Sequence, residues 1–252
     1  MRYACHVIPF PATHRSVLER IRSEDADERR IAFGDLAEGY WRPSYHYLRL
    51  HWHFAPEAAE DAVQAFFTTA FEKGYVERFD PAKARFRTFL RVCLDRFVQN
   101  QQKAERADKR GGGVTHLSLD FAGAELELEG REIALSTLRD PSTSDLDRFF
   151  HDETVRALFG RTVAAMERLY ASEGKSIVFR VFERHDLKPT PDASYASVAG
   201  ELGLSTSRVT NYLHAARRRF RELALQHLRS LVASEAEFRL EARELFGIDV
   251  ET

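Results

Sequence analysis

Residues 194–220 read SYASVAGELGLSTSRVTNYLHAARRRF. Ser194 and Ser205 are typical helix N-cap residues, and Gly203 between them can adopt the left-handed conformation that ends a helix. Apolar residues recur at helical spacing after each cap, which predicts two buried helix faces. These apolar residues are Tyr195, Val198, Ala199 and Leu202 in the first helix, Leu204 in the turn, and Val209, Tyr212, Leu213, Ala216 and Phe220 in the second. The stretch therefore predicts a helix-turn-helix.

The second helix of this motif has a polar outer face near its start. In helix-turn-helix proteins that part of the second helix lies in the major groove of DNA and contacts base edges. The residues expected to face outward there are Thr206, Ser207, Arg208, Thr210, Asn211 and His214. Arg217 and Arg218 follow, where they could bind phosphates. A plain helical hairpin with a basic exposed face is the alternative interpretation.

Outside this motif the chain also has helical periodicity, and alternating strand-like runs are absent. We expect an all-α protein of two helical domains joined by an acidic linker. The expected divisions are 1–24 as an N-terminal extension, 25–113 as the first domain, 114–145 as the linker, 146–231 as the second domain and 232–252 as a C-terminal extension.

Helix boundaries follow from the turn signals. We expect a helical pair over 25–54 with Pro43 in a first turn, because proline suits the first helical position. The other expected elements are a helix at about 56–73 with Phe71 in its buried stripe and Gly74 as its stop, a helix at 84–110 ended by Gly111, Gly112 and Gly113, and a loop at 185–193 within the second domain.

Charge is strongly segmented along the 252 residues, although 37 Lys and Arg nearly balance 39 Asp and Glu. Residues 80–113 hold nine basic and four acidic residues, and residues 205–230 hold six basic residues and one acidic residue. Residues 114–154 between them hold ten acidic and three basic residues. Two basic blocks indicate a polyanion contacted at two places. Two ordinary solvated helix faces are the alternative.

Several function classes find no support in the sequence. No apolar run reaches the ~18 residues of a membrane helix, and Met1 to Phe10 is interrupted by His6 and Pro9 before a signal-peptide core can form. Cys5 and Cys93 stand far apart, without a disulfide or zinc pattern. We expect a cytoplasmic protein without cofactor or metal.

An enzyme is the first competing interpretation. His46, His51 and His53 lie near Trp52, but their spacing does not suit a helical metal site. The sequence contains no P-loop, dinucleotide fingerprint or nucleophile elbow. We therefore expect that the chain is not an enzyme.

Three stretches, in this order, resemble the extracytoplasmic-function (ECF) sigma factors of the sigma-70 family, which are promoter-recognition subunits of bacterial RNA polymerase. AEDAVQAFF at 59–67 resembles the helix of sigma domain two that docks on the clamp coiled coil of the β′ subunit. FDP at 79–81, followed by RFRTFL at 85–90, resembles the part of domain two that engages the melted minus-ten element. Residues 194–223 resemble sigma domain four, whose second helix reads the minus-thirty-five element.

The resemblance implies three sets of contact residues. The residues implied to contact the minus-thirty-five element are Thr206, Ser207, Arg208, Thr210, Asn211, His214, Arg217 and Arg218. Those implied to contact the minus-ten element are Arg85, Arg87, Phe89, Arg91, Arg96, Asn100, Lys103 and Arg106. Those implied to bind polymerase are Glu57, Glu60, Asp61, Gln64 and Phe67. By the same resemblance the acidic linker would run through the RNA channel of the polymerase.

Structural roles are the alternatives for these residues. Phe86, Phe89 and Phe97 could be core residues at helical spacing. The carboxylates at the start of the helix at 56–73 could simply favour the helix dipole.

The implied partners are core RNA polymerase, through its β′ clamp and β flap, and promoter DNA. An anti-sigma factor or a Ser/Thr kinase could regulate the chain, and no membrane is implied. Ala58 and Ala65 occupy places where the family usually has acids, so the docking surface is less acidic than usual. Related factors of this kind are activated by threonine phosphorylation, and Thr68 and Thr69 lie in the corresponding stretch, where a phosphate would add about −1.5 to −2 charge.

A stand-alone helix-turn-helix regulator is the second competing interpretation. It would explain 194–223 but neither the acidic docking helix nor the second basic block. Such a regulator would bind duplex DNA by itself, whereas a sigma factor would bind core polymerase as a monomer.

Overall fold

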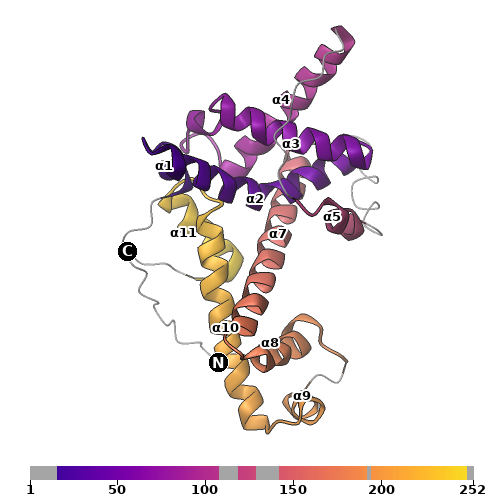
Figure 1. Cartoon of the computed structure of the whole chain (residues 1–252), viewed down its shortest axis with the longest axis vertical. Coiled ribbons are helices and arrows are strands. Elements are labelled where there is room, and N and C mark those ends of the chain that lie inside the picture. Colours follow the sequence, from indigo (N-terminus) through magenta and orange to yellow (C-terminus); the bar gives the residue numbers. More distant parts are fainter. Residues whose placement is uncertain (1–15, 108–118, 129–141, 192–193, 249–252) are drawn as a thin grey trace. The chain divides into compact units, whose positions relative to one another are not determined.

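The computed structural model describes residues 16–107, 119–128, 142–191 and 194–248, and every element in these ranges is a helix (Figure 1). The all-α prediction is therefore confirmed for the described part of the chain. The α-helices are α1 (Val17–Ile21), α2 (Ala26–Leu50), α3 (Pro56–Glu72), α4 (Phe86–Ala107), α5 (Phe121–Leu128), α7 (Thr143–Ser172), α8 (Ser176–Phe182), α9 (Tyr195–Leu202), α10 (Thr206–Arg229) and α11 (Glu235–Phe246). A 3-10 helix, η1 (Val76–Arg78), and a π-helix, η2 (Glu183–Leu187), complete the set. Within these ranges no helix combines the length and the apolar composition needed to cross a bilayer.

The chain divides into two compact units, which differ from the predicted domains. Unit 1 comprises residues 1–157 together with 228–252, and unit 2 comprises residues 158–227. Residues 232–248, the described part of the segment expected as an extension, belong to unit 1. A contact within that unit shows why, because the backbone amide of Phe86 donates a hydrogen bond of 2.7 Å to the carboxylate of Glu237.

Helix α2 runs through 25 residues without a break, so the prediction of a helical pair over 25–54 was wrong. Its N-cap Asp25 accepts hydrogen bonds from the amides of Asp27 and Glu28. Pro43 lies inside the helix and removes a backbone donor, which ordinarily costs about 3 kcal/mol. The helix face around it is buried against the rest of unit 1 and includes Tyr40, Trp41, Tyr45, Tyr47 and Leu48. We attribute the continuity of α2 to this packing.

Helix α3 begins and ends close to the predicted positions, and α4 begins close to its predicted start. Gly74 has φ of +59°, as expected for a residue that follows a helix end. Phe71, expected in the buried stripe of α3, is instead 44% exposed and lies against Phe33, with ring centroids 5.0 Å apart. The predicted end of the next helix at Arg110 and the three glycines after it lie outside the described residues.

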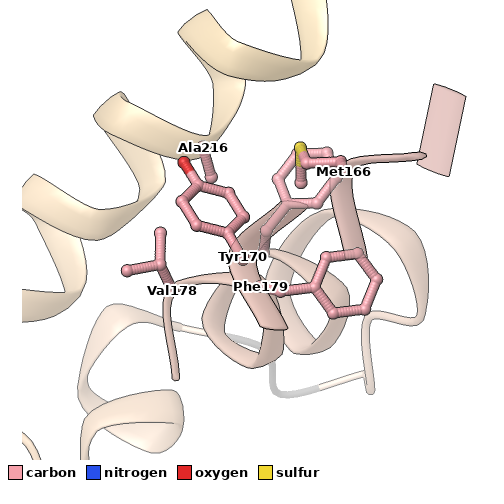
Figure 2. Close-up of a cluster of buried hydrophobic side chains, with 6 residues drawn as sticks. Met166, Tyr170, Val178, Phe179 and Ala216 are labelled. Carbon is pink, nitrogen blue, oxygen red and sulfur yellow. The ribbon is translucent and has the colours of Figure 1, made fainter. Parts of the chain in front are cut away.

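Unit 2 is built around two neighbouring apolar clusters. Figure 2 shows the first, in which Met166 and Tyr170 of α7 meet Val178 and Phe179 of α8 and Ala216 of α10. The second consists of Val181, Val198, Ala199, Val209 and Leu213. Since α8 supplies residues to both clusters and α10 also does, these two helices hold α9 in place.

Candidate functional site

The turn between α9 and α10 has the predicted local geometry. Ser194 caps α9 through a capping box with Ser197, in which each backbone N–H donates to the hydroxyl of the other residue at 3.1 and 2.9 Å. Gly203 has φ of +64° and ψ of +36°, and the hydroxyl of Ser205 accepts a hydrogen bond of 3.3 Å from the amide of Arg208. Tyr195 is the exception to the predicted buried face, because it is 40% exposed and its ring lies 5.0 Å from that of His185.

The first turns of α10 have a buried face and an exposed polar face. Val209, Leu213 and Ala216 are at most 1% exposed, and they fix the rotation of the helix. The exposed side chains are Thr206, Ser207, Arg208, Thr210, Asn211 and His214, which is the set predicted from the sequence. Arg208 donates a hydrogen bond of 3.2 Å to the hydroxyl of Tyr212, so the next turn of the helix orients its guanidinium.

Arg217, predicted to bind phosphate, is already paired with a protein carboxylate. Its guanidinium donates two hydrogen bonds of 2.7 Å to Asp186 of η2, and His185 lies 2.6 Å from the same carboxylate. Burial raises the pKa of Asp186, but the hydrogen bonds from Arg217 and His185 outweigh it and leave the pKa below its usual value. Arg218 is exposed, with Glu222 3.8 Å away. The sequence did not reveal the Asp186 partner, since no local spacing rule joins residues 31 apart.

Arg85 and Arg87, at the start of α4, are paired with the acidic helix α11. Arg85 donates hydrogen bonds of 2.8 Å to both oxygens of Glu244 and one of 2.9 Å to Glu241. Arg87 also pairs with Glu241. The hydrogen bond from Arg85 holds the pKa of Glu244 below its usual value. In this structure two of the predicted minus-ten residues are therefore engaged by carboxylates.

Further along α4 the predicted residues divide into buried and exposed ones. Arg91 is 3% exposed and pairs with Asp95 and Asp147 at 2.7 Å each, so its guanidinium is buried and engaged by carboxylates in this structure. Phe89 packs against Phe79, with ring centroids 5.2 Å apart. The exposed members are Arg96, Asn100 and Lys103, and the side chain of Arg106 lies outside the described part.

Only part of the predicted docking set on α3 is accessible. Glu57 and Asp61 are exposed and Glu60 is half-buried, and their spacing places them on one side of the helix. Gln64 is 8% exposed and Phe67 is 1% exposed, so neither presents a surface to a partner here. Thr68 and Thr69 are half-buried.

The acidic segment between the two basic blocks contains a helix that the sequence analysis did not predict. Within unit 1, α5 packs on α2, where Glu125 accepts hydrogen bonds of 2.6 Å from Tyr45 and 2.9 Å from Arg49. The hydrogen bond from Arg49 lowers the pKa of Glu125. Residues 119–128 are thus held by the first unit, a contact that the linker prediction omitted.

The histidines of α2 and of the loop after it have different surroundings. His46 is buried, with Nδ1 2.6 Å from Glu153 and Nε2 3.1 Å from the carbonyl of Ala124. Burial lowers the pKa of His51, and His53 is exposed. Among the described residues, no group of three or more His, Cys, Asp or Glu side chains could hold a metal ion.

Comparison with known proteins gave no relative: no family model, no curated protein and no solved structure matches this chain.

Proposed function

We propose that this chain is a sigma factor of the ECF group, which binds core RNA polymerase and directs promoter recognition and transcription initiation. The observation that carries the proposal is the face of α10 from Thr206 to His214. Six polar side chains are exposed there, on the first turns of the helix. Gly203, in the left-handed conformation, ends α9 and leads into the turn that begins α10. This is the arrangement with which helix-turn-helix proteins read the major groove.

Two further features support a sigma factor over a regulator that acts alone. The exposed Arg96, Asn100 and Lys103 of α4 form a second polar and basic surface, suited to phosphates and unstacked bases. Glu57, Glu60 and Asp61 form an acidic start to α3, where Glu57 and Asp61 are exposed and Glu60 is half-buried. An acidic helix surface suits a basic partner helix. A regulator that acts alone would need neither surface.

The test is run-off transcription with purified core RNA polymerase on pooled genomic fragments from the source organism. Transcripts that start only when the protein is present, at sites with two shared and spaced upstream elements, are the expected result. Duplex binding without polymerase, together with no new start sites, would instead identify a helix-turn-helix regulator.

Arg208→Ala should lower promoter-dependent transcription by about 5- to 150-fold, because a side chain that contacts a base contributes about 1–3 kcal/mol. Arg221→Ala is the matched control, since Arg221 is also exposed on α10 but lies outside the proposed reading face. Equal activity of both variants with the wild type would contradict the proposed role of α10.

Thr68 and Thr69 of α3 extend the proposal to regulation by a Ser/Thr kinase. A phosphate on either would add negative charge to a helix in which Ala58 and Ala65 replace acids. Thr68/Thr69→Ala should therefore lose activity in cells while keeping its fold. Unchanged polymerase affinity and unchanged activity of this double variant would remove the kinase from the proposal.

A further inference from the structure

Helix α11 covers the start of α4 with a row of carboxylates. Glu237, Glu241 and Glu244 recur at spacings of four and three residues and so share one face of α11. Glu244 binds Arg85 through both oxygens, and Glu241 pairs with Arg85 and Arg87. Glu237 accepts a hydrogen bond of 2.7 Å from the backbone amide of Phe86.

An apolar face anchors the same helix within unit 1. Phe238 and Ala242 are fully buried, and the guanidinium of Arg229 lies 4.0 Å from the centre of the Phe238 ring. The Glu241 side chain is 3% exposed, so its carboxylate is shielded from water where it contacts Arg85 and Arg87. The helix is therefore held by apolar burial, and its carboxylates are aimed at the two arginines.

Carboxylates in this arrangement occupy the hydrogen-bonding positions that phosphate oxygens would use. An arginine fork binds a carboxylate or a phosphate through the same pair of N–H groups, so one ligand excludes the other. Both α11 and α4 belong to unit 1, so the pairing is a contact within one compact body.

We propose that α11 is an autoinhibitory cover that competes with single-stranded DNA for Arg85 and Arg87. The inference rests on the proposed function, which supplies the DNA strand. The free chain then binds a single strand weakly through the exposed residues of α4, and binding strengthens when α11 leaves Arg85 and Arg87.

The test compares two single substitutions on α11. Glu244→Gln removes a carboxylate that binds Arg85, and Glu235→Gln removes one that binds Arg229 at 2.7 Å. The two side chains are 43% and 46% exposed, and both substitutions remove one negative charge. Affinity of the full chain for a fluorescent random-sequence 20-nucleotide DNA strand is measured by anisotropy across a salt series. The double variant Glu241→Gln/Glu244→Gln also removes the carboxylate that pairs with Arg87, so that neither Arg85 nor Arg87 keeps a carboxylate partner from these two positions.

Glu244→Gln should bind the strand more tightly than Glu235→Gln, and the double variant should gain about tenfold at low salt. Its plot of log affinity against log salt should steepen by about 0.7 to 1.4, which corresponds to one or two added phosphate contacts. Arg85→Gln should change affinity little in the wild type but reverse part of the gain in the double variant. Equal affinity of the wild type, Glu244→Gln and the double variant for the DNA strand would contradict the proposal that α11 competes with it.

Hydrogen exchange of the wild type gives a second measurement that needs no substitution. Saturating DNA strand should increase exchange in α11, and unchanged protection of α11 would also overturn the proposal. Failure of the proposed function has a different signature. In that case neither the wild type nor the double variant starts transcripts with core polymerase, whatever their affinities for the strand.

Discussion

Gly203 and Gly200 occupy the same short segment but have opposite backbone requirements. Gly203 has φ of +64°, whereas Gly200 lies inside α9, and a Cβ added at either position meets no atom within 4 Å. Gly203→Ala should therefore lower the free energy of unfolding by about 1–2 kcal/mol through backbone strain alone. Gly200→Ala should raise it by about 0.5–1 kcal/mol, because alanine is the better helix former. Urea unfolding of both variants measures the difference, and changes of the same sign would contradict the assigned conformations.

His227 should make the stability of unit 2 depend on pH. Burial, with the nearby charges of Arg161 and Arg168, lowers its pKa to about 4, against about 6.5 in an unfolded chain. The unfolded state therefore binds a proton that the folded state excludes, and stability falls as pH drops from about 6.5 to about 4. His227→Gln should show a smaller loss of Tm between pH 7.5 and pH 5 than the wild type. Burial also lowers the pKa of His51 and of His151. Both residues are present in the wild type and in the variant, so their contribution to the change in Tm cancels in the comparison.

Among the elements, η2 and α10 are joined by the Asp186 and Arg217 pair. The carboxylate is 19% exposed and the guanidinium 44% exposed, so solvent screens part of the interaction. We expect Asp186→Asn to lower the free energy of unfolding by about 1 kcal/mol. Thermal unfolding measures it, and Glu183→Gln, which removes the exposed pair between η2 and Lys188, is the control with a smaller expected effect. A loss no larger than that of the control would show that the Arg217 pair contributes little.

Elements with local signals were predictable from the sequence. The cap Ser194, the left-handed Gly203 and the apolar spacing around Val209 each act within a few residues, and the structure has all three as expected. The exposed face at the start of α10 follows from the same spacing, because burying one side of a helix leaves the other exposed.

Contacts between distant segments were not predictable. Nothing close to Arg91 in sequence shows that Asp147 lies beside it, and Arg85 meets Glu244 across 159 residues. Closely spaced arginines have the same local sequence pattern whether they face solvent or pair with a distant carboxylate. The sequence analysis therefore assigned Arg85, Arg87 and Arg91 to one DNA-binding surface. Similarly, the helix boundary near Pro43 was predicted from local helix propensity. Tertiary packing of α2 within unit 1 overrides that propensity.

At the scale of the whole molecule, unit 1 draws on segments far apart in the chain. Phe238 is fully buried in that unit, so Phe238→Ala should lower its stability by about 3–5 kcal/mol. Hydrogen exchange resolved by peptide should report the loss in α2 and α4. Leu240→Ala on the same helix is the control, because Leu240 is 44% exposed and should cost under about 1 kcal/mol. Equal effects of the two substitutions would contradict the packing of α11.

The hydrogen bond from Tyr40 to Leu231 spans 191 residues, which has a consequence for biosynthesis. Domains generally fold as they leave the ribosome, in the order of translation. Unit 2 is continuous in sequence and can fold while unit 1 still lacks residues 228–252. Since α11 is translated after every other described helix, a nascent chain passes through a stage in which Arg85 and Arg87 have been made but the carboxylates that bind them have not.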